Sequence, residues 1–285
     1  MTKYTYTTPP GALLSGSLGG CINRQEFNAL PPSAAAIGWN KATGTPVYID
    51  LAAAPHVLIA GTTGSGKSVA MHDIITSLLF KNTPATAEII LVDPKLVELS
   101  IYERVPVVRQ CVTDPAAALA TLQRLRRDMM KRYDDMRRRG IRNAGSGGYK
   151  RIYVFIDEIA DLMFTDKRET EKVISSLARL GRAAGVHLII ATQRPTRDVL
   201  TGQIKLNIPC RLELAVPAAV DSVTILGHKG AEMLTGRGDG LLKRPDNIHC
   251  EHVQCAFISD TELNKVIDYC QAQRPARRPW FKKAG

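Results

Sequence analysis

The sequence predicts an α/β protein in which helices cover both faces of a mostly parallel central sheet. Two observations support this prediction. Short apolar runs, typical of strands buried on both faces, recur along the chain with helical segments between several of them. A glycine-rich phosphate-binding motif follows the first clear run and precedes a helical pattern. The predicted strands are residues 56–60, 88–92, 105–108, 152–156, 187–191 and 212–216.

Three helices are predicted between these strands. The first begins after Gly66. The second begins at Asp114, because Asp is a favoured N-cap and the following Pro115 suits the first helical position, and it ends at the basic run before Gly140. The third spans about residues 169–184. The stretch 140–150 is rich in glycine and basic residues, so we expect a flexible loop there.

The length of 285 residues fits one large domain with short extensions. Residues 1–36 are rich in Thr, Pro, Gly and Ala without a clear period, which indicates an extended N-terminal arm or loop packed on the domain. Residues 37–262 form the predicted main domain, and residues 263–285 the end of a C-terminal helix and a basic tail. No apolar run reaches the roughly 18 residues of a membrane helix. The apolar stretch 13–20 is too short and interrupted to indicate a signal peptide.

The composition indicates a polyanionic partner and a reducing compartment. A net charge of +11 favours nucleic acid or an anionic membrane surface without choosing between them. The basic tail from Arg274 onward is either solvated or in contact with DNA or a partner. Six cysteines without a dense disulfide spacing are expected to be reduced thiols of a cytoplasmic protein. A zinc site in residues 249–255 is disfavoured, because these residues alternate as in a strand and no second Cys/His pair follows.

The strongest local signal is the sequence GTTGSGKS, residues 61–68, which fits the P-loop pattern between a predicted strand and a predicted helix. The N–H groups of such a loop surround phosphate oxygens, and the helix N-terminus adds positive potential. Lys67 is expected to reach the β- and γ-phosphates of ATP, and the Ser68 hydroxyl to bind Mg²⁺. The expected ATP-binding residues are Gly61, Thr62, Thr63, Gly64, Ser65, Gly66, Lys67, Ser68 and Val69.

The second half of the predicted site is the apolar strand 152–156, which ends in two carboxylates. Asp157 is expected to hold the Mg²⁺ shell, and Glu158 to polarise the attacking water as a general base. A nucleotide switch does not need this glutamate, so its presence predicts hydrolysis. Gln193, at the tip of another predicted strand, is the candidate sensor of the γ-phosphate.

Six segments carry a wider resemblance: GTTGSGKS (61–68), DPKLVELSIYE (93–103), DEIADLM (157–163), RAAGVHLIIATQRP (182–195), TGQIKLNIPCR (201–211) and VDSVTILGHKGAEMLTGRGD (220–239). Together they resemble the motor domain of FtsK/SpoIIIE DNA translocases, over roughly residues 37–260. The resemblance implies a RecA-like domain that assembles into a ring, usually a hexamer, around double-stranded DNA. It also implies that ATP lies between neighbouring subunits.

The resemblance also implies residues that act between subunits and on DNA. Arg182 is the first candidate for an arginine finger, and the helical spacing places Arg179 beside it, opposite the apolar face. Both arginines could instead be solvated, and Arg211 is a second candidate finger. Pore loops near residues 194–205 are expected to contact the DNA backbone without reading its sequence. The expected DNA-binding residues are Arg194, Arg197 and Lys205.

The chain departs from the cell-division members of this family. We expect no room for their membrane helices, linker and winged-helix domain, and Ala219 stands where relatives often carry a lysine. By analogy, such a minimal motor suits a virus, plasmid or other mobile element, acting in the cytoplasm of a bacterial or infected host cell. The predicted function is an ATP-driven translocase of double-stranded DNA. The alternatives are a genome-packaging or conjugative-coupling ATPase with a portal or channel partner, and a nucleotide-gated DNA-binding assembly factor.

Overall fold

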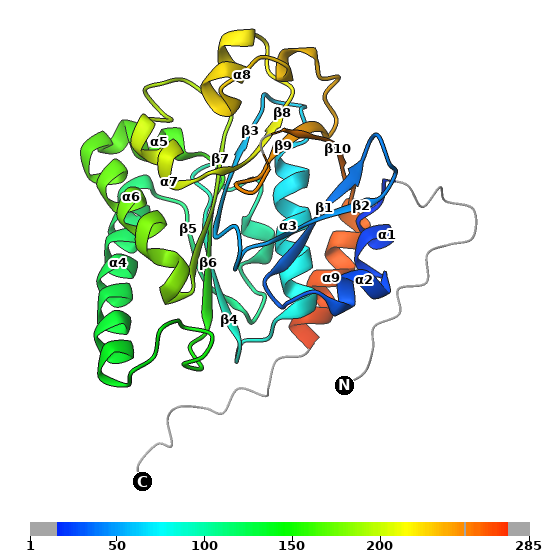
Figure 1. Cartoon of the computed structure of the whole chain (residues 1–285). Coiled ribbons are helices and arrows are strands. Elements are labelled where there is room, and N and C mark those ends of the chain that lie inside the picture. The colour runs from blue at the N-terminus through cyan, green and yellow to red at the C-terminus, as the bar shows by residue number, and fades with distance from the viewer. Residues whose placement is uncertain (1–15, 248, 273–285) are drawn as a thin grey trace.

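A computed structural model describes residues 16–247 and 249–272, and in these residues one ten-stranded sheet crosses the molecule (Figure 1). The strand order is β2-β1-β10-β9-β8-β3-β7-β6-β4-β5. Strands β8 to β5 of this order pair in parallel, and those from β2 to β8 pair antiparallel. The strands are β1 (Ala34–Asn40), β2 (Pro46–Asp50), β3 (His56–Ala60), β4 (Ala87–Val92), β5 (Val108–Val112), β6 (Arg151–Ile156), β7 (Val186–Thr192), β8 (Cys210–Leu214), β9 (Asp239–Lys243) and β10 (Glu251–Cys255).

Helices cover both faces of this sheet, which confirms the predicted fold class. Two buried apolar clusters lie on opposite faces, one with α3 and α9 and the other with α4, α5 and α6. The α-helices are α1 (Leu18–Ile22), α2 (Gln25–Ala29), α3 (Lys67–Lys81), α4 (Pro115–Arg138), α5 (Ile159–Thr165), α6 (Lys167–Ala184), α7 (Gly202–Asn207), α8 (Ala219–Leu226) and α9 (Asp260–Ala272). Two 3₁₀ turns are η1 (Ser100–Tyr102) and η2 (Ala231–Met233).

The long helices α4 and α6 begin at residues whose side chains cap them. The Asp114 carboxylate accepts a hydrogen bond from the Ala117 N–H at 2.7 Å, and Pro115 is the first residue of α4, as predicted. Helix α6 starts two residues earlier than predicted, because Asp166 caps it through the Glu169 N–H. It ends at Gly185, whose φ of 71° is the left-handed conformation that terminates many helices.

Residues 16–36 pack on the domain as expected, but they are not an extended arm, and residues 1–15 lie outside the described part. The short helices α1 and α2 occupy this segment, and Leu18 and Phe27 lie in the core at 1% exposure each. Strand β1 follows and pairs with β10, more than 200 residues later in the chain. Five-residue helices are too short to show a period, and a strand beginning with three alanines resembles a loop in composition.

Two predicted strands are displaced. The run 105–108 is mostly a turn, and the strand here is β5, from Val108 to Val112. Strand β8 begins and ends two residues before the predicted 212–216. Residues 251–255 form β10 as predicted, and within the described residues no three His, Cys, Asp or Glu side chains group as a metal site. The basic tail from Arg274 lies outside the described residues.

None of the helices in the described ranges combines the length and apolar character needed to cross a membrane.

Candidate nucleotide-binding and catalytic site

The predicted P-loop connects the buried strand β3 to helix α3. Gly64 and Gly66 have φ values of 79° and 102°, a conformation that glycine adopts without steric cost. A Cβ atom on Gly66 would lie 2.6 Å from the backbone nitrogen of Gly238, so a side chain does not fit there. Among the described residues no side chain caps the start of α3, and its first N–H groups remain available to an anion.

Lys67 and Asp157 meet at the centre of the site. Lys67 lies in the first turn of α3 and Asp157 directly follows β6, and their side chains are 3% and 1% exposed. The Lys67 Nζ donates to Asp157 Oδ1 at 2.5 Å and to the Asp157 carbonyl oxygen at 2.9 Å. Burying either charge alone would be costly, so the pairing explains how both are tolerated in the interior.

Glu158 is held in a fixed orientation by three donors. Its Oε1 accepts from the Ala160 N–H at 3.1 Å and the Thr192 hydroxyl at 2.6 Å, and its Oε2 accepts from the Gln193 N–H at 2.8 Å. The first of these bonds also caps α5. The two carboxylates that follow β6 therefore have different partners. Asp157 pairs with the P-loop lysine, and Glu158 is hydrogen-bonded to residues at the end of β7.

Gln193 links the end of β7 to the P-loop, because its Oε1 accepts a hydrogen bond from the Thr63 hydroxyl at 3.0 Å. The structure thus brings Lys67, Asp157, Glu158 and Gln193 together at the carboxyl edge of the parallel strands. Thr192, which holds Glu158, is a site residue that sequence reasoning missed. The available signal was a polar residue directly after the apolar run 188–191.

A turn from Thr235 to Asp239 packs against the P-loop and was also missed. The Gly238 N–H donates to the Ser65 carbonyl oxygen at 2.7 Å, and the Arg237 N–H donates to the Gly64 carbonyl oxygen at 3.3 Å. The available signal for this turn was the pair of glycines on either side of Arg237. The segment 220–239 was used only for its resemblance to the family.

The Asp239 carboxylate anchors this turn. It accepts hydrogen bonds from the N–H and hydroxyl of Thr235 at 3.0 Å each and from Lys41 at 2.9 Å, and His252 Nε2 lies 2.7 Å away. Although burial acts in the opposite direction, the hydrogen bonds from Thr235, Lys41 and His252 hold the pKa of Asp239 well below its usual range. The turn is therefore fixed by charge as well as by its contacts with the P-loop.

Arg182 does not reach the P-loop of its own chain. It lies in the last turn of α6 and lines a cavity of about 430 Å³ with Arg179 and Arg151. Residues at the starts of β6 and β7 line the same cavity, whereas Asp157 and Gln193 follow the ends of these strands. Arg182 therefore lies near the amino ends of these strands, and the P-loop lies at the carboxyl ends.

Arg211, the second candidate finger, is engaged by its own chain. Its guanidinium donates to the carbonyl oxygens of Ile208 at 3.1 Å, Ile225 at 2.6 Å and Lys205 at 2.5 Å. These bonds join β8 to the ends of α7 and α8. Arg211 thus has a structural role, which removes it as a free cation for a neighbouring subunit.

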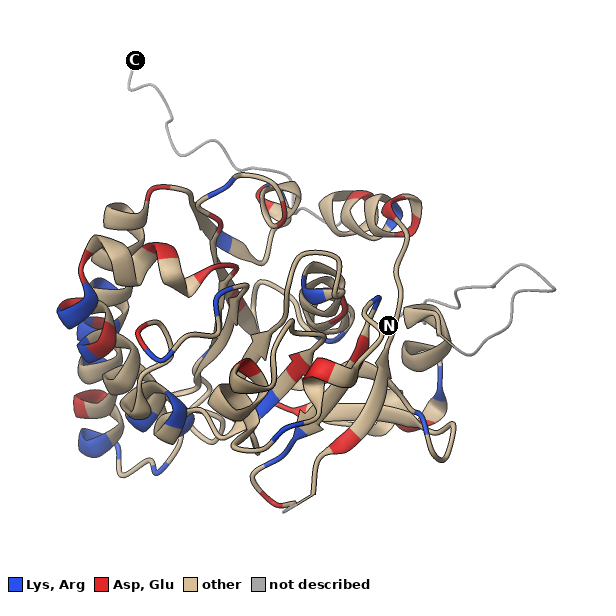
Figure 2. Cartoon of the chain, turned by 90° about the horizontal axis from the view of Figure 1, so that it is seen from above, with Lys and Arg blue, Asp and Glu red and all other residues tan. Residues whose placement is uncertain are grey.

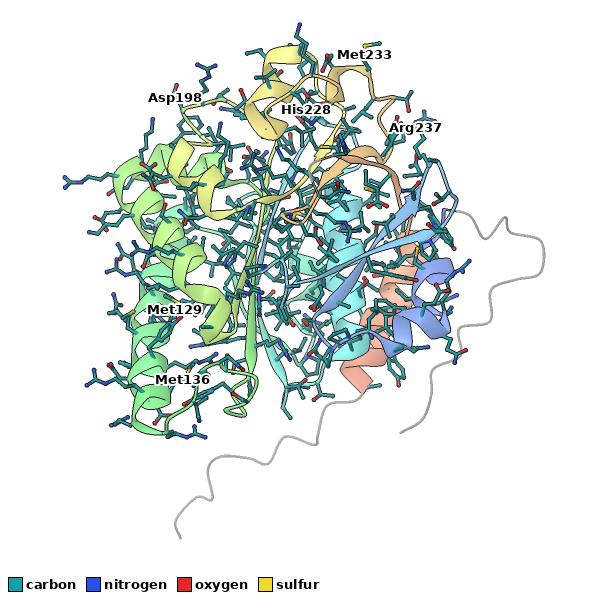
Figure 3. The ribbon with its side chains drawn as sticks, in the orientation of Figure 1. Met129, Met136, Asp198, His228, Met233 and Arg237 are labelled. Atoms are coloured by element: carbon teal, nitrogen blue, oxygen red, sulfur yellow. The ribbon has the colours of Figure 1, made fainter. Side chains whose placement is uncertain are left out.

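The candidate DNA-binding residues lie between β7 and α8. Arg194 and Arg197 are exposed, and the Arg194 guanidinium lies 5.6 Å from the ring centre of Phe164. Asp198, next to Arg197, extends from the molecular rim (Figure 3) and pairs with Lys167 at 3.1 Å. The Lys205 ammonium instead donates to the Thr224 carbonyl oxygen at 2.9 Å. Of these three candidates, Lys205 is therefore the one whose side chain is hydrogen-bonded to a backbone carbonyl group in the described structure.

Charged residues of both signs alternate on the side of the molecule formed by α4 and α6 (Figure 2). The pair Lys172–Glu169, at 3.0 Å within α6, is one example. This side therefore does not form a uniformly basic surface, and the exposed arginines after β7 remain the better candidates for contacts with phosphate groups.

Comparison with known proteins places this site in a family context. The FtsK/SpoIIIE family model matches residues 23–152 and 148–197. Proteins named DNA translocase FtsK from Helicobacter pylori and Caldanaerobacter subterraneus are 42% and 45% identical to this chain over 242 and 257 residues. These alignments cover 81% and 87% of this chain but 29% and 36% of those proteins, so the chain spans about a third of their length.

Among solved structures, the pCW3 conjugation coupling protein TcpA, a monomer form with ATPγS, has a TM-score of 0.74 and 30% sequence identity. The alignment covers 86% of this chain and 73% of that one. The cytoplasmic domain of the type VII secretion ATPase EccC of Thermomonospora curvata has a TM-score of 0.75 at 22% identity, covering 91% of this chain and 34% of that one. The latter similarity concerns the fold alone.

Proposed function

Because this chain belongs to the FtsK/SpoIIIE family, we propose that it hydrolyses ATP to drive translocation along double-stranded DNA. The observation that carries the proposal is the convergence of Lys67, Asp157, Glu158 and Gln193 around the P-loop. A phosphate-binding loop alone would suit a nucleotide switch. A buried, oriented glutamate beside it suits hydrolysis.

The residues present fit ATP with Mg²⁺. The loop N–H groups and the Lys67 ammonium suit the phosphates, and the Ser68 hydroxyl and Asp157 carboxylate are the hard oxygen ligands that Mg²⁺ prefers. The bound ion would neutralise charge on the β- and γ-phosphates. The Ser65 hydroxyl is buried without a hydrogen-bond partner among the described residues, which leaves one further polar group inside the loop.

Glu158 is the proposed general base, and it would accept the proton of the attacking water. Its three donors orient the carboxylate without an ordering step during the reaction. The Gln193 side chain, already bonded to the P-loop residue Thr63, is the proposed sensor of the γ-phosphate. Phosphoryl transfer of this kind depends mainly on positioning and charge neutralisation, and this arrangement provides both.

We further propose a ring, with six subunits as the expected number, in which Arg182 acts on the ATP of a neighbour. A ring is built from head-to-tail contacts, in which two different surfaces of the subunit meet. The P-loop and Arg182 lie on different parts of the subunit surface, so Arg182 of one subunit can serve the P-loop of another in such a contact. Arg182 would then stabilise charge that develops in the transition state.

Arg194, Arg197 and Lys205 are the proposed contacts to the DNA backbone. The exposed arginines after β7 support this assignment, and Lys205 would first have to leave the Thr224 carbonyl group. Contacts of this type bind every sequence similarly and weaken as salt rises. We propose that residues 37–262, together with α1 and α2, form the motor unit and act in the cytoplasm.

The deciding experiment is the steady-state ATPase rate with and without long linear duplex DNA, with a Glu158→Gln variant as the control. The expected result is strong stimulation by DNA that disappears in the variant. The similarity to the conjugation coupling protein favours one second candidate, a coupling ATPase that depends on a channel partner. A low rate that does not respond to DNA would contradict the translocase and support this second candidate.

A further inference from the structure

We propose that Arg237 binds the purine base of the nucleotide, and that the turn from Thr235 to Asp239 forms the wall of the site on the nucleoside side. This inference rests on the proposed binding of ATP at the P-loop. It assigns a ligand contact to a residue on the opposite side of β3 from Asp157 and Glu158.

The order of the strands gives the direction of the nucleotide. Strand β3, which leads into the P-loop, lies between β7 and β8. Asp157, Glu158 and Gln193 follow β6 and β7, so the γ-phosphate end belongs on that side of β3. The nucleoside must then leave the P-loop on the other side, toward β8 and β9. The turn that carries Arg237 directly precedes β9 and lies on this nucleoside side.

The turn and the P-loop are bonded into one unit. Besides the bonds to Gly64 and Ser65, the Gln254 side-chain amide donates to the Arg237 carbonyl oxygen at 2.8 Å. The Cys255 N–H donates to the Gly238 carbonyl oxygen at 2.7 Å. The root of the Arg237 side chain is therefore held at a fixed distance from the phosphate-binding backbone.

Arg237 has an unfavourable backbone conformation that its surroundings maintain. Its φ is 53°, between Gly236 at 79° and Gly238 at 89°. A left-handed conformation is uncommon for a bulky residue and persists where neighbouring contacts impose it, often at ligand sites. The residue with this strained backbone conformation is also one whose backbone N–H is hydrogen-bonded to the P-loop.

The guanidinium of Arg237 is available to a ligand. The side chain is exposed, and no ion pair or side-chain hydrogen bond within the described ranges engages it. Figure 3 shows Arg237 at the same end of the molecule as His228 and Met233. A planar guanidinium stacks favourably on an aromatic ring, and the phosphates already have Lys67 and the loop amides. The purine base is therefore the ligand group that suits Arg237.

The test compares two probes in equilibrium binding measured by titration calorimetry. One is the Mg²⁺ complex of a non-hydrolysable ATP analogue, and the other is Mg²⁺ tripolyphosphate, which has no nucleoside. The main variant is Arg237→Asn, because asparagine tolerates the left-handed conformation and keeps the turn intact. Arg237→Lys retains the charge without the planar group, and Arg127→Ala replaces an exposed arginine on α4 as the matched control.

We expect Arg237→Asn to weaken binding of the ATP analogue about tenfold, with tripolyphosphate binding unchanged, and Arg237→Lys to recover only part of the loss. The Arg127→Ala protein should bind both probes as the wild type does. An unchanged affinity of Arg237→Asn for the ATP analogue would overturn the assignment, and so would an equal loss for both probes. Failure of the wild-type protein to bind either probe would instead refute the proposed ATP site.

Discussion

A buried carboxyl group beside the P-loop strand leads to a specific prediction about stability. Glu213 lies on β8, where it pairs with Ala60 of β3, and it is fully buried beneath α8. Its Oε2 accepts a hydrogen bond from the Ser222 hydroxyl at 3.3 Å, while Oε1 has no partner among the described residues. Burial raises the pKa of Glu213 from 4.5 to about 8.

This shift makes stability depend on pH in a defined direction. Because the folded-state pKa is the higher one, the stabilising effect of the bound proton is complete below about pH 4.5 and is lost as pH rises toward 8. At about 1.4 kcal/mol per pH unit, the rise from 4.5 to about 8 corresponds to an upper bound of about 5 kcal/mol. A Glu213→Gln side chain has a similar size and cannot ionise. The variant should therefore gain stability over the wild type as pH increases.

The assay is urea-induced unfolding, followed by circular dichroism at several pH values between about 5 and about 9. The informative quantity is the difference in unfolding free energy between Glu213→Gln and the wild type at each pH. Asp134→Asn, at an exposed position on α4, makes the matching carboxylate-to-amide change outside the core and is the control. A Glu213→Gln difference that stays constant across the range would refute the reasoning.

Three further predictions concern the proposed site. Lys67→Met should abolish ATP binding, and it should destabilise the fold by roughly 3 kcal/mol because it leaves Asp157 buried without its partner. Titration calorimetry measures the binding, and urea unfolding measures the stability. Retained ATP binding would contradict the prediction. Arg182→Ala should reduce the DNA-stimulated ATPase rate by about a thousandfold while ATP affinity is kept, and Arg127→Ala is its control. Arg194→Ala should weaken duplex binding equally for unrelated sequences and lower the slope of log affinity against log salt by about one. A loss confined to one DNA sequence would argue against a backbone contact.

The sequence by itself determined the local chemistry of this protein. The strand, loop and helix around residues 61–68, the Asp114 cap of α4 and the strand ending at Asp157 all depend on neighbouring residues. Glycine conformations, capping groups and apolar runs act over a few positions, so their pattern can be read directly. The P-loop and both carboxylates were therefore predictable before any packing was known.

The tertiary structure alone decided which distant groups meet. The turn around Arg237 contacts Gly64 and Ser65, which precede it by more than 170 residues in the sequence. No local sequence pattern predicts that contact. Packing also places the Arg211 guanidinium in hydrogen bonds to three backbone carbonyl groups. The sequence around Arg211 does not distinguish it from an exposed arginine. Arg182 lies at the far edge of the sheet because α6 runs back along it after β6. Hydrogen-bond partners between distant segments depend on how strands and helices stack, and short-range propensity does not encode that arrangement.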